Sequence, residues 1–143
     1  MIILDTNVLS ELMRPEPPPR VAAWAARQPA SELFTTSITE AEIFYGIELL
    51  PKGKRRERLL AAAEAMFAED FGGRICGFDS DAARVFSRIA AHRRARGRPI
   101  GHADAQIAAI AGARGAKLAT HNVADFEDCN VDVIDPWEGK SAL

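Results

Sequence analysis

The sequence predicts an α/β layer fold, built around a mostly parallel β-sheet, in a single domain. The first observation behind this prediction is that short apolar or β-branched segments alternate along the chain with longer segments of helical spacing. The second is the length of 143 residues, which fits one compact domain with a core of its own. The third is that no internal repeat or low-complexity segment interrupts this order. We therefore expect one α/β domain over residues 1–143.

Five segments have the composition of β-strands. They are short, and most of them carry the β-branched, aromatic or alternating apolar residues that strands favour. In chain order they are residues 1–4 (MIIL), 33–37 (LFTTS), 74–78 (RICGF), 117–120 (KLAT) and 131–135 (VDVID). In parallel sheets, ligands bind outside the carboxyl ends of the strands, near the point where the strand order reverses. Residues that directly follow these segments are therefore the first candidates for a site.

Segments with the spacing and composition of helices lie between the predicted strands. Prolines end the first three of them, and the fourth is rich in alanine, leucine and charged residues. Asp79 and Ser80 can cap the fifth, and Gly97 and Gly115 end the last two. In chain order the predicted helices are residues 6–14, 20–28, 38–50, 54–71, 79–97 and 103–115.

The composition is that of an ordinary soluble domain, with 48% hydrophobic and 27% charged residues, and it excludes a disordered or membrane-embedded chain. No apolar run approaches the roughly 20 residues that span a bilayer. The four residues before Asp5 are too few for a signal-peptide core. Cys76 and Cys129 form no CxxC motif and are expected to be reduced thiols. We therefore expect a cytoplasmic protein that does not contact a membrane.

Four carboxylates occupy comparable places in this predicted fold. They are Asp5 after the first strand, Glu42 early in the helix after the second, Asp104 at the start of a later helix, and Asp125 in the loop after the fourth strand. If the sheet forms as predicted, at least three of them meet at one edge. Close carboxylates repel one another, so such a cluster raises the pKa of one member or binds a cation.

The donor set favours a hard cation. Carboxylate oxygens prefer Mg²⁺ or Mn²⁺, whereas the three histidines lack the HxxxH or CxxC companions of a zinc site. A divalent cation at such a site activates water and stabilises charge on a phosphodiester, so phosphodiester hydrolysis is the chemistry that fits. Ser10, Ser37 and Ser80 lack an evident His/Asp arrangement, which argues against a serine hydrolase.

Each acid also has a purely structural interpretation. Asp5 can cap the helix that follows it, and Asp104 can complement a helix dipole. Glu42 ends the segment 39–42, which matches a capping box, as does the segment 37–40. A single acid is therefore weak evidence, and the case for a metal site depends on the whole set.

Four separated stretches are spread over almost the whole chain, from residue 3 to residue 137: ILDTNVLSEL, ITEAEIFYGIELLPKGKRR, GHADAQIAAIAGARGAKLATHNVADF and VIDPW. Together, in order and with the usual gaps, they resemble PIN-domain toxins of the VapC/FitB type, which belong to type II toxin–antitoxin systems. The resemblance implies a three-layer PIN-like fold with a central parallel sheet, helices on both faces and an acidic pocket at one end. It also implies a toxic, Mg²⁺- or Mn²⁺-dependent endoribonuclease that forms a homodimer. A cognate VapB/FitA-like antitoxin would inhibit it and carry the contact with DNA.

The resemblance assigns roles to individual residues. Asp5 in LDTN matches one acidic metal ligand, and Asp104 in HADAQIAA matches another. Glu42 in TEAEIFYGI matches the remaining acid. Thr6 lies beside Asp5 and is expected to orient it by hydrogen bonding. The expected catalytic residues are thus Asp5, Glu42 and Asp104, with the two aspartates holding the metal.

The fourth acidic position departs from the family pattern. Relatives commonly carry an acid or Asn in a TR(N/D)xxxF loop, whereas this chain has Thr120, His121 and Asn122, followed by Asp125. Asn122 can hold a water but adds no charge, and Asp125 can replace it or merely form a turn. Both are candidates for positioning water or the metal, and His121 stands in place of the more usual Arg.

Two basic segments provide candidates for RNA contacts. Residues 52–58 (KGKRRER) and 92–98 (HRRARGR) can attract the phosphates that an acidic pocket repels, although such clusters also occur on solvated helices. The candidates are Lys52, Lys54, Arg55, Arg56, Arg93 and Arg94.

A second function stays open at this point. A PIN domain that has lost its catalysis would act as a binding or regulatory subunit through its antitoxin–DNA complex. The neutral Asn122 favours this alternative, and the three retained acids argue against it. A haloacid-dehalogenase phosphatase fits less well, because Asn7 stands where that chemistry needs a second Asp.

Overall fold

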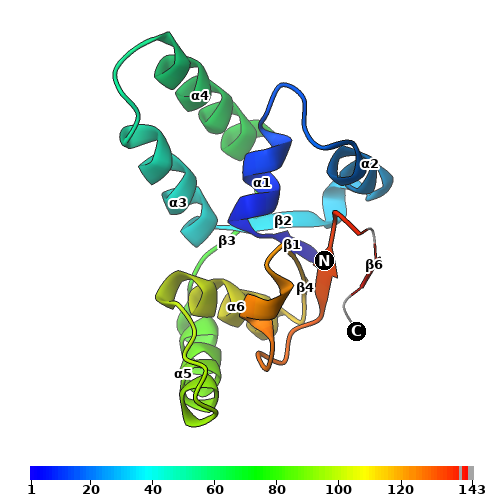
Figure 1. The fold of residues 1–143 in the computed structure, drawn as a ribbon, viewed down its shortest axis with the longest axis vertical. Helices are drawn as coiled ribbons and strands as arrows, with labels where there is room; N and C mark the ends of the chain where they lie inside the picture. The colour runs from blue at the N-terminus through cyan, green and yellow to red at the C-terminus, as the bar shows by residue number, and fades with distance from the viewer. Residues whose placement is uncertain (139, 142–143) are drawn as a thin grey trace.

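The computed structural model describes residues 1–138 and 140–141 of the chain. A six-stranded sheet in the order β3-β2-β1-β4-β5-β6 forms its centre (Figure 1). The strands are β1 (Ile2–Leu4), β2 (Leu33–Thr36), β3 (Ile75–Cys76), β4 (Lys117–Ala119), β5 (Val133–Asp135) and β6 (Lys140–Ser141). Strands β1 to β5 are parallel, which confirms the predicted sheet. The sequence did not predict β6, which pairs antiparallel with β5.

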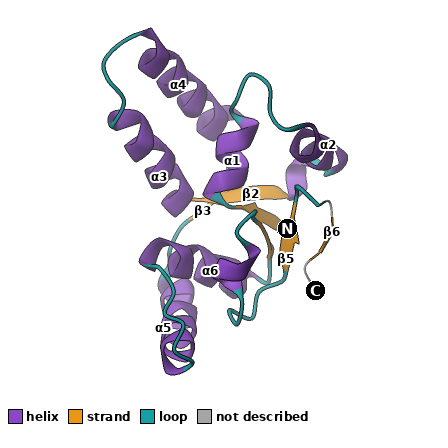
Figure 2. Cartoon of the chain, in the orientation of Figure 1, coloured by secondary structure: helices purple, strands orange, loops and turns teal. Residues whose placement is uncertain are grey.

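The described residues form six α-helices, in the places that the sequence predicted. They are α1 (Thr6–Leu12), α2 (Pro19–Arg27), α3 (Ser37–Glu48), α4 (Lys54–Ala65), α5 (Ser80–Ala95) and α6 (His102–Arg114). The predicted helix over 54–71 ends as an α-helix at Ala65 and continues as a π-helical turn, Met66–Asp70. Helices α1, α3 and α4 lie on one side of the sheet, and α5 and α6 lie on the other (Figure 2). None of the described helices is long and apolar enough to cross a bilayer.

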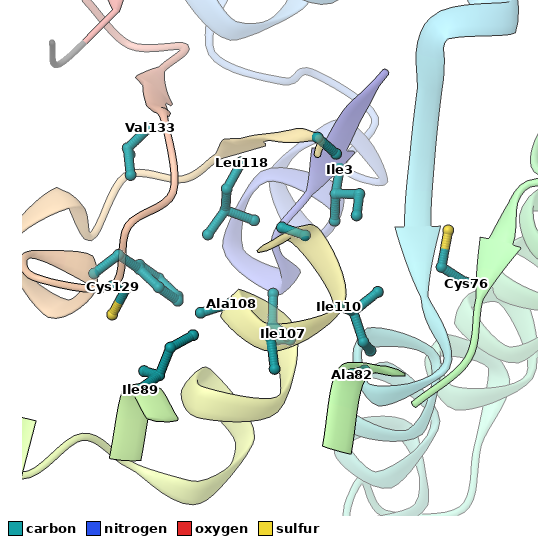
Figure 3. Packing of buried hydrophobic residues seen from close by; sticks show 14 residues of the cluster. Ile3, Cys76, Ala82, Ile89, Ile107, Ala108, Ile110, Leu118, Cys129 and Val133 are labelled. Atoms are coloured by element: carbon teal, nitrogen blue, oxygen red, sulfur yellow. The ribbon is translucent and has the colours of Figure 1, made fainter. Parts of the chain in front are cut away.

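The sheet is buried on both faces, as a parallel sheet requires. Neighbouring strand residues point to opposite sides, so Ile3 packs with the core under α5 and α6 while Leu4 packs with the core under α1 to α4. Leu118 and Ala119 of β4 divide in the same way. Figure 3 shows Ile3 and Leu118 against Ile107 of α6 in the first of these cores. The prediction of helices on both faces is confirmed.

The start of α3 differs from both predicted capping boxes. Thr36, the last residue of β2, is the N-cap, and its hydroxyl accepts a hydrogen bond from the backbone N–H of Thr39 at 3.0 Å. The capping-box interpretation of Glu42 is therefore wrong. Glu42 lies in the second turn of α3 and is exposed, so helix capping does not explain it.

The strand order reverses between β1 and β4. After β1 the chain builds β2 and β3 on one side, and it then returns to place β4 on the other side. The two carboxyl ends meet there, where the backbone N–H of Asp5 donates to the carbonyl of Ala119 at 2.9 Å. The segments that follow β1 and β4 thus border one crevice, which is where ligands bind in open α/β sheets.

Candidate active site

Asp5 lies at the centre of this crevice and is only 4% exposed. It is the N-cap of α1, and its Oδ1 accepts from the backbone N–H of Thr6 at 2.8 Å. Its Oδ2 accepts from the hydroxyl of Thr120 at 2.8 Å and from the amide of Asn7 at 3.0 Å. Burial raises the pKa of Asp5, and the hydrogen bonds from Thr120, Thr6 and Asn7 oppose that rise. The capping role predicted for Asp5 is confirmed, and the same contacts fix the carboxylate at the edge of the sheet.

Thr6 connects α1 to Glu42 of α3. Its backbone, rather than its side chain, contacts Asp5. Its hydroxyl donates to Oε1 of Glu42 at 2.7 Å and lies 3.1 Å from the hydroxyl of Thr39. The side chain of Thr6 therefore orients the second acid of the predicted set, a role that the sequence did not suggest.

Asp104 faces the same crevice from the first turn of α6. Burial raises its pKa to about 6, and the negative charges of Asp5, Asp125 and Glu42 add to the rise. The positive charge of Arg93 lowers the pKa of Asp104 and so opposes this rise. Charges act in this way through space, so the fold brings Asp5, Glu42 and Asp125 within electrostatic reach of Asp104, although the four acids come from four different segments.

The donor chemistry of this cluster suits a hard divalent cation. Carboxylates that repel one another gain from a positive charge between them, and Mg²⁺ is commonly held by one or two carboxylates, with water and substrate phosphates completing its shell. Among the described residues, no group of three or more His, Cys, Asp or Glu side chains is placed to hold an ion by itself. The arrangement fits a cation bound through Asp5 and Asp104 with water, rather than a closed structural site.

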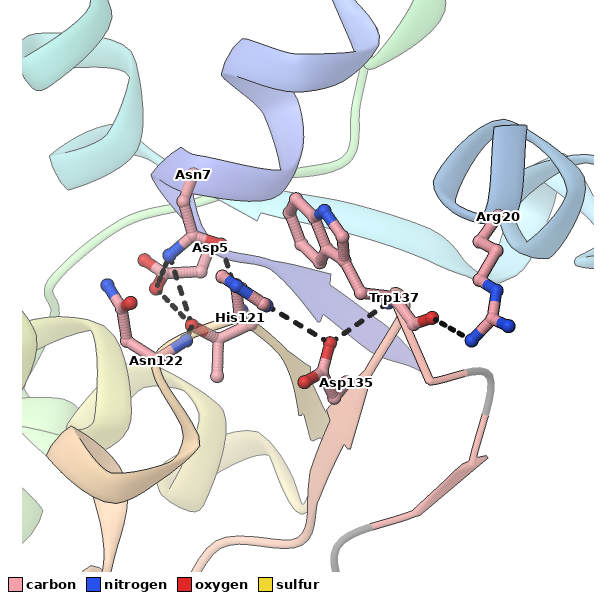
Figure 4. A network of polar contacts seen from close by, with 8 residues as sticks. Asp5, Asn7, Arg20, His121, Asn122, Asp135 and Trp137 are labelled. Atoms are coloured by element: carbon pink, nitrogen blue, oxygen red, sulfur yellow. Dashed lines mark hydrogen bonds and ion pairs between the residues drawn. The ribbon is translucent and has the colours of Figure 1, made fainter. Parts of the chain in front are cut away.

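Asn7 and Thr120 complete the polar network, and sequence reasoning assigned neither of them a role in it (Figure 4). Asn7 donates to Asp5 and, at 3.1 Å, to the hydroxyl of Thr120. The Asn7 side-chain oxygen accepts from the backbone N–H of His121 at 3.0 Å. Thr120 also accepts from the backbone N–H of Asn122 at 3.1 Å. The motif LDTN could have indicated the role of Asn7, because Asn7 lies in the first turn of α1, two positions after Asp5, and its amide reaches the carboxylate of Asp5.

The fourth acidic position is open to solvent. Asn122 and Asp125 are both exposed and border a cavity of about 500 Å³. Asp125 lies in a short 3₁₀ turn, Val123–Phe126, and its charge acts on Asp104. Asn122 precedes that turn, and its backbone is held by Thr120. Both residues reach the edge of the crevice, but the charge comes from Asp125.

The prediction that Arg93 contacts RNA is wrong. Its side chain is 5% exposed and lies inside the fold. Its Nε donates to the carbonyl of Arg98 at 2.7 Å, and its Nη1 donates to the carbonyls of Asp125 and Glu127 at 2.8 and 3.0 Å. Arg93 is therefore not available to RNA. It joins the turn before Asp104 to the loop that carries Asp125.

The other predicted RNA contacts lie at the surface to different degrees. Lys52, Lys54 and Arg94 are exposed. Arg56 is partly covered and forms an ion pair with Glu48 at 2.8 Å. Arg55 is exposed and borders a cavity of about 630 Å³ that Thr6 and Glu42 also line. Arg55 thus lies closer to the acids than the position of the basic segment in the sequence suggested.

Comparison with known proteins places this arrangement in a family. The sequence matches the PIN domain over residues 2–129. The "VapC ribonuclease Y4jK" of Sinorhizobium fredii is 41% identical over 138 residues, which covers 96% of this chain and 99% of that protein. The "Toxin FitB" of Neisseria gonorrhoeae is 36% identical over 137 residues, with the same coverage. The "tRNA(fMet)-specific endonuclease VapC" of Salmonella typhimurium is 33% identical over 107 residues, or 75% of this chain and 76% of that one.

Solved structures show the same likeness in three dimensions. FitAcB from Neisseria gonorrhoeae superposes with a TM-score of 0.89 at 36% identity, covering 96% of this chain and 99% of that chain. FitAB bound to an IR36 DNA fragment gives the same TM-score and identity, with 96% of each chain covered. DNA-bound VapBC from Salmonella typhimurium gives a TM-score of 0.79 at 29% identity, with 94% and 97% covered.

Proposed function

The chain belongs to the PIN-domain family, as a ribonuclease toxin of the VapC/FitB type, and from that premise we propose that it hydrolyses RNA phosphodiester bonds with a Mg²⁺ ion held by Asp5 and Asp104. Mn²⁺ is the alternative ion, because both are hard cations that prefer oxygen donors. The observation that carries the proposal is that hydrogen bonds hold Asp5 and Glu42 at one crevice; the raised pKa of Asp104, to which Asp5, Asp125 and Glu42 contribute, supports it. A carboxylate cluster of this kind is favourable at neutral pH when a cation offsets its charge.

Each residue of the crevice has its own role in the proposed reaction. When bound, Mg²⁺ supplies a positive charge for the phosphate and acidifies water. Asp5, which Thr120 and Asn7 hold in place, and Asp104 would hold the ion. Glu42, fixed by Thr6, orients the attacking water and accepts its proton. Asn122 and Asp125 hold water at the open side. A water there would give a proton to the departing 3′-oxygen, so that cleavage leaves a 5′-phosphate and a 3′-hydroxyl. No side-chain nucleophile takes part.

A cleavage assay on purified protein, free of its antitoxin, tests the proposal. Structured RNA is incubated with the wild type in Mg²⁺, in Mn²⁺ and in EDTA, and with the Asp5→Asn and Asp104→Asn variants. We expect metal-dependent cleavage that falls by about 100-fold or more in each variant. Asp81→Asn, in the exposed first turn of α5, is the matched control and should retain full activity. Cleavage that survives EDTA or both substitutions would remove the metal and these acids from the mechanism.

Protein partners follow from the family and from the surface of α3. The relatives FitAcB and VapBC are toxin–antitoxin complexes, so we propose a VapB/FitA-like antitoxin that inhibits this chain and carries the contact with DNA. Tyr45 on α3 and Leu49, the C-cap one turn later, are 66% and 67% exposed. We propose that they contribute to a homodimer. Light scattering on Tyr45→Ser/Leu49→Ser protein should show a monomer, and an unchanged mass would reject this interface.

The second candidate function is a regulatory subunit without catalysis. The neutral, exposed Asn122 favours it, because its amide adds no charge to the site and leaves that to the exposed Asp125. Such a protein would bind its antitoxin and promoter DNA yet would cleave no RNA under any metal condition. Induced expression without the antitoxin separates the two candidates: growth arrest that Asp104→Asn abolishes supports the nuclease. We place either protein in the cytoplasm, where RNA and the antitoxin meet.

A further inference from the structure

A pair of aromatic rings stands beside the acidic crevice. The imidazole of His121 packs against the indole of Trp137, with ring centroids 4.3 Å apart and planes inclined by 37°. The side chain of His121 is 54% exposed, so the pair can be reached from solvent. Figure 4 shows the two rings next to Asp5 and Asn7. We call these two side chains the His121–Trp137 platform.

The platform is held at a fixed position relative to the catalytic centre. The backbone N–H of His121 donates to Asn7, which in turn donates to Oδ2 of Asp5. On the other side, Nδ1 of His121 lies 3.5 Å from Oδ1 of Asp135, and that same oxygen accepts from the backbone N–H of Trp137 at 2.9 Å. A group that rests on these rings is therefore placed at a defined distance from Asp5, and little side-chain entropy is lost when it binds.

The surroundings of His121 suit a nucleobase rather than a phosphate. A cavity of about 500 Å³ lies beside the ring, which is enough space for a base. Asn122, Asp125, Asp135 and Glu138 line it together with His121. Their carboxylates repel a phosphate but accept hydrogen bonds from the N–H groups on the edge of a base.

Positive charge lies on the other side of Trp137. Arg20 and Arg27 of α2 border a cavity of about 230 Å³ together with Trp137. Nη1 of Arg20 donates to the carbonyl of Trp137 at 3.4 Å, and both arginines are exposed. Aromatic rings next to exposed arginines are the combination by which proteins bind single-stranded nucleic acid, with stacking for the bases and charge for the backbone.

We propose that the His121–Trp137 platform binds a base of single-stranded RNA next to the cleaved bond, and that Arg20 and Arg27 bind the phosphate of a neighbouring nucleotide. The inference rests on the proposed nuclease function and adds a path for the substrate. It places the RNA strand across the carboxyl ends of β1, β4 and β5 towards α2. The four residues that form this path, His121, Trp137, Arg20 and Arg27, lie outside both basic segments singled out from the sequence.

Fluorescence of a base analogue tests the platform without any need for cleavage. The Asp104→Asn protein is titrated with a short single-stranded RNA that carries 2-aminopurine at each position in turn, because stacking on an aromatic ring quenches this fluorophore. We expect strong quenching at one position or two adjacent ones. His121→Ala should abolish the quenching and weaken binding by about 5- to 150-fold, the effect of losing one stacked base. His121→Tyr should restore both, because it keeps the ring.

The arginines have their own measurement and control. Arg20→Ala should reduce the slope of log affinity against log salt by about one, as expected for one lost phosphate contact. Arg84→Ala changes an exposed arginine on α5, which packs on the other face of the sheet from α2 (Figure 1), and should leave the slope unchanged. An unchanged slope in Arg20→Ala, or an equal loss in both variants, would reject the path along α2.

The outcomes distinguish this inference from the nuclease proposal. If RNA stacks on the platform but wild-type protein never cleaves it, the platform stands and the nuclease assignment fails. If wild-type protein cleaves RNA and His121→Ala neither changes the quenching nor slows cleavage, the platform is rejected and the nuclease stands. If His121→Ala weakens only the complex with the antitoxin, the rings are a protein contact and the inference is overturned.

Discussion

Asp104 lies where three other carboxylates act on it, and this makes its protonation a switch for the proposed chemistry. Its pKa is raised to about 6 from the usual 3.8, first by burial and then by the charges of Asp5, Asp125 and Glu42. A protonated Asp104 cannot bind a cation. We expect kcat/KM for RNA cleavage, measured at subsaturating Mg²⁺, to rise as the pH passes through about 6. A rate that is flat from pH 5 to pH 7.5 would contradict the role of Asp104.

The same shift predicts that Asp104→Asn stabilises the fold. Because the folded-state pKa lies above the unfolded value, the folded state binds more protons between pH 3.8 and about 6, and the wild type loses stability as the pH rises through that window. The neutral variant avoids this loss. Without metal, its melting temperature should exceed that of the wild type at pH 7.5, and the difference should shrink towards pH 4. Asp81→Asn should show no such pH-dependent difference.

Arg93 has a structural role that its exposed neighbour does not share. Its guanidinium donates to three carbonyls and is buried. Arg93→Met should lower the free energy of unfolding by about 1–3 kcal/mol, because buried carbonyls lose their donors. Arg94→Met, at an exposed position on the same helix, should change it by less than about 0.5 kcal/mol. Urea denaturation measures both, and equal effects would contradict the role assigned to Arg93.

At the scale of elements, α3 brings Glu42 to the crevice, and its start depends on Thr36. The Thr36 hydroxyl accepts from the N–H of Thr39 inside the core. Thr36→Val keeps the shape of the side chain but removes this cap, and should cost about 0.5–2 kcal/mol of stability. Thr36→Ser keeps the hydroxyl and should lose less stability than Thr36→Val. Thermal unfolding of both variants measures the difference, and an equal loss would mean that the methyl group matters more than the cap.

Local sequence patterns predicted the elements well, for a physical reason. Apolar spacing, prolines and glycines act within a few residues of one another, and they marked five strands and six helices to within a few residues. The pair Lys140–Ser141 carries no such signal, and β6 forms because β5 offers it an edge. The capping boxes over 37–40 and 39–42 were equally good patterns, but the end of β2 put the cap at Thr36.

The site was harder to predict than the elements, because its contacts join distant parts of the chain. The acids could be named because each follows a predicted strand or begins a helix. The hydrogen bonds that hold these acids could not be predicted, since Asn7 and Thr120 are 113 positions apart and Thr6 and Glu42 are 36 apart. Arg93 was misassigned for the same reason. Its basic neighbours suggested a surface, whereas three carbonyls that accept from it enclose it.

For the whole molecule, the proposed cation should act as a stabilising ligand. An ion that binds the folded chain alone raises stability by about 2.7 kcal/mol when its free concentration is about 100 times its Kd. We expect MgCl₂ to raise the melting temperature of the wild type, and EDTA to reverse the effect. Asp5→Asn and Asp104→Asn should not respond, while Asp81→Asn should respond as the wild type does. An equal rise in all four proteins would indicate a general salt effect.

The place of β1 in the middle of the sheet also has a consequence for synthesis on the ribosome. Asp5 is translated well before Thr120, whose hydroxyl holds it and which is 115 positions later. Until that distant segment has left the exit tunnel, the edge of β1 that pairs with β4 stays unpaired, and the active site is not assembled. If the chain is the ribonuclease proposed above, this late assembly of its active site would give the cell time to make an antitoxin before the first RNA is cleaved.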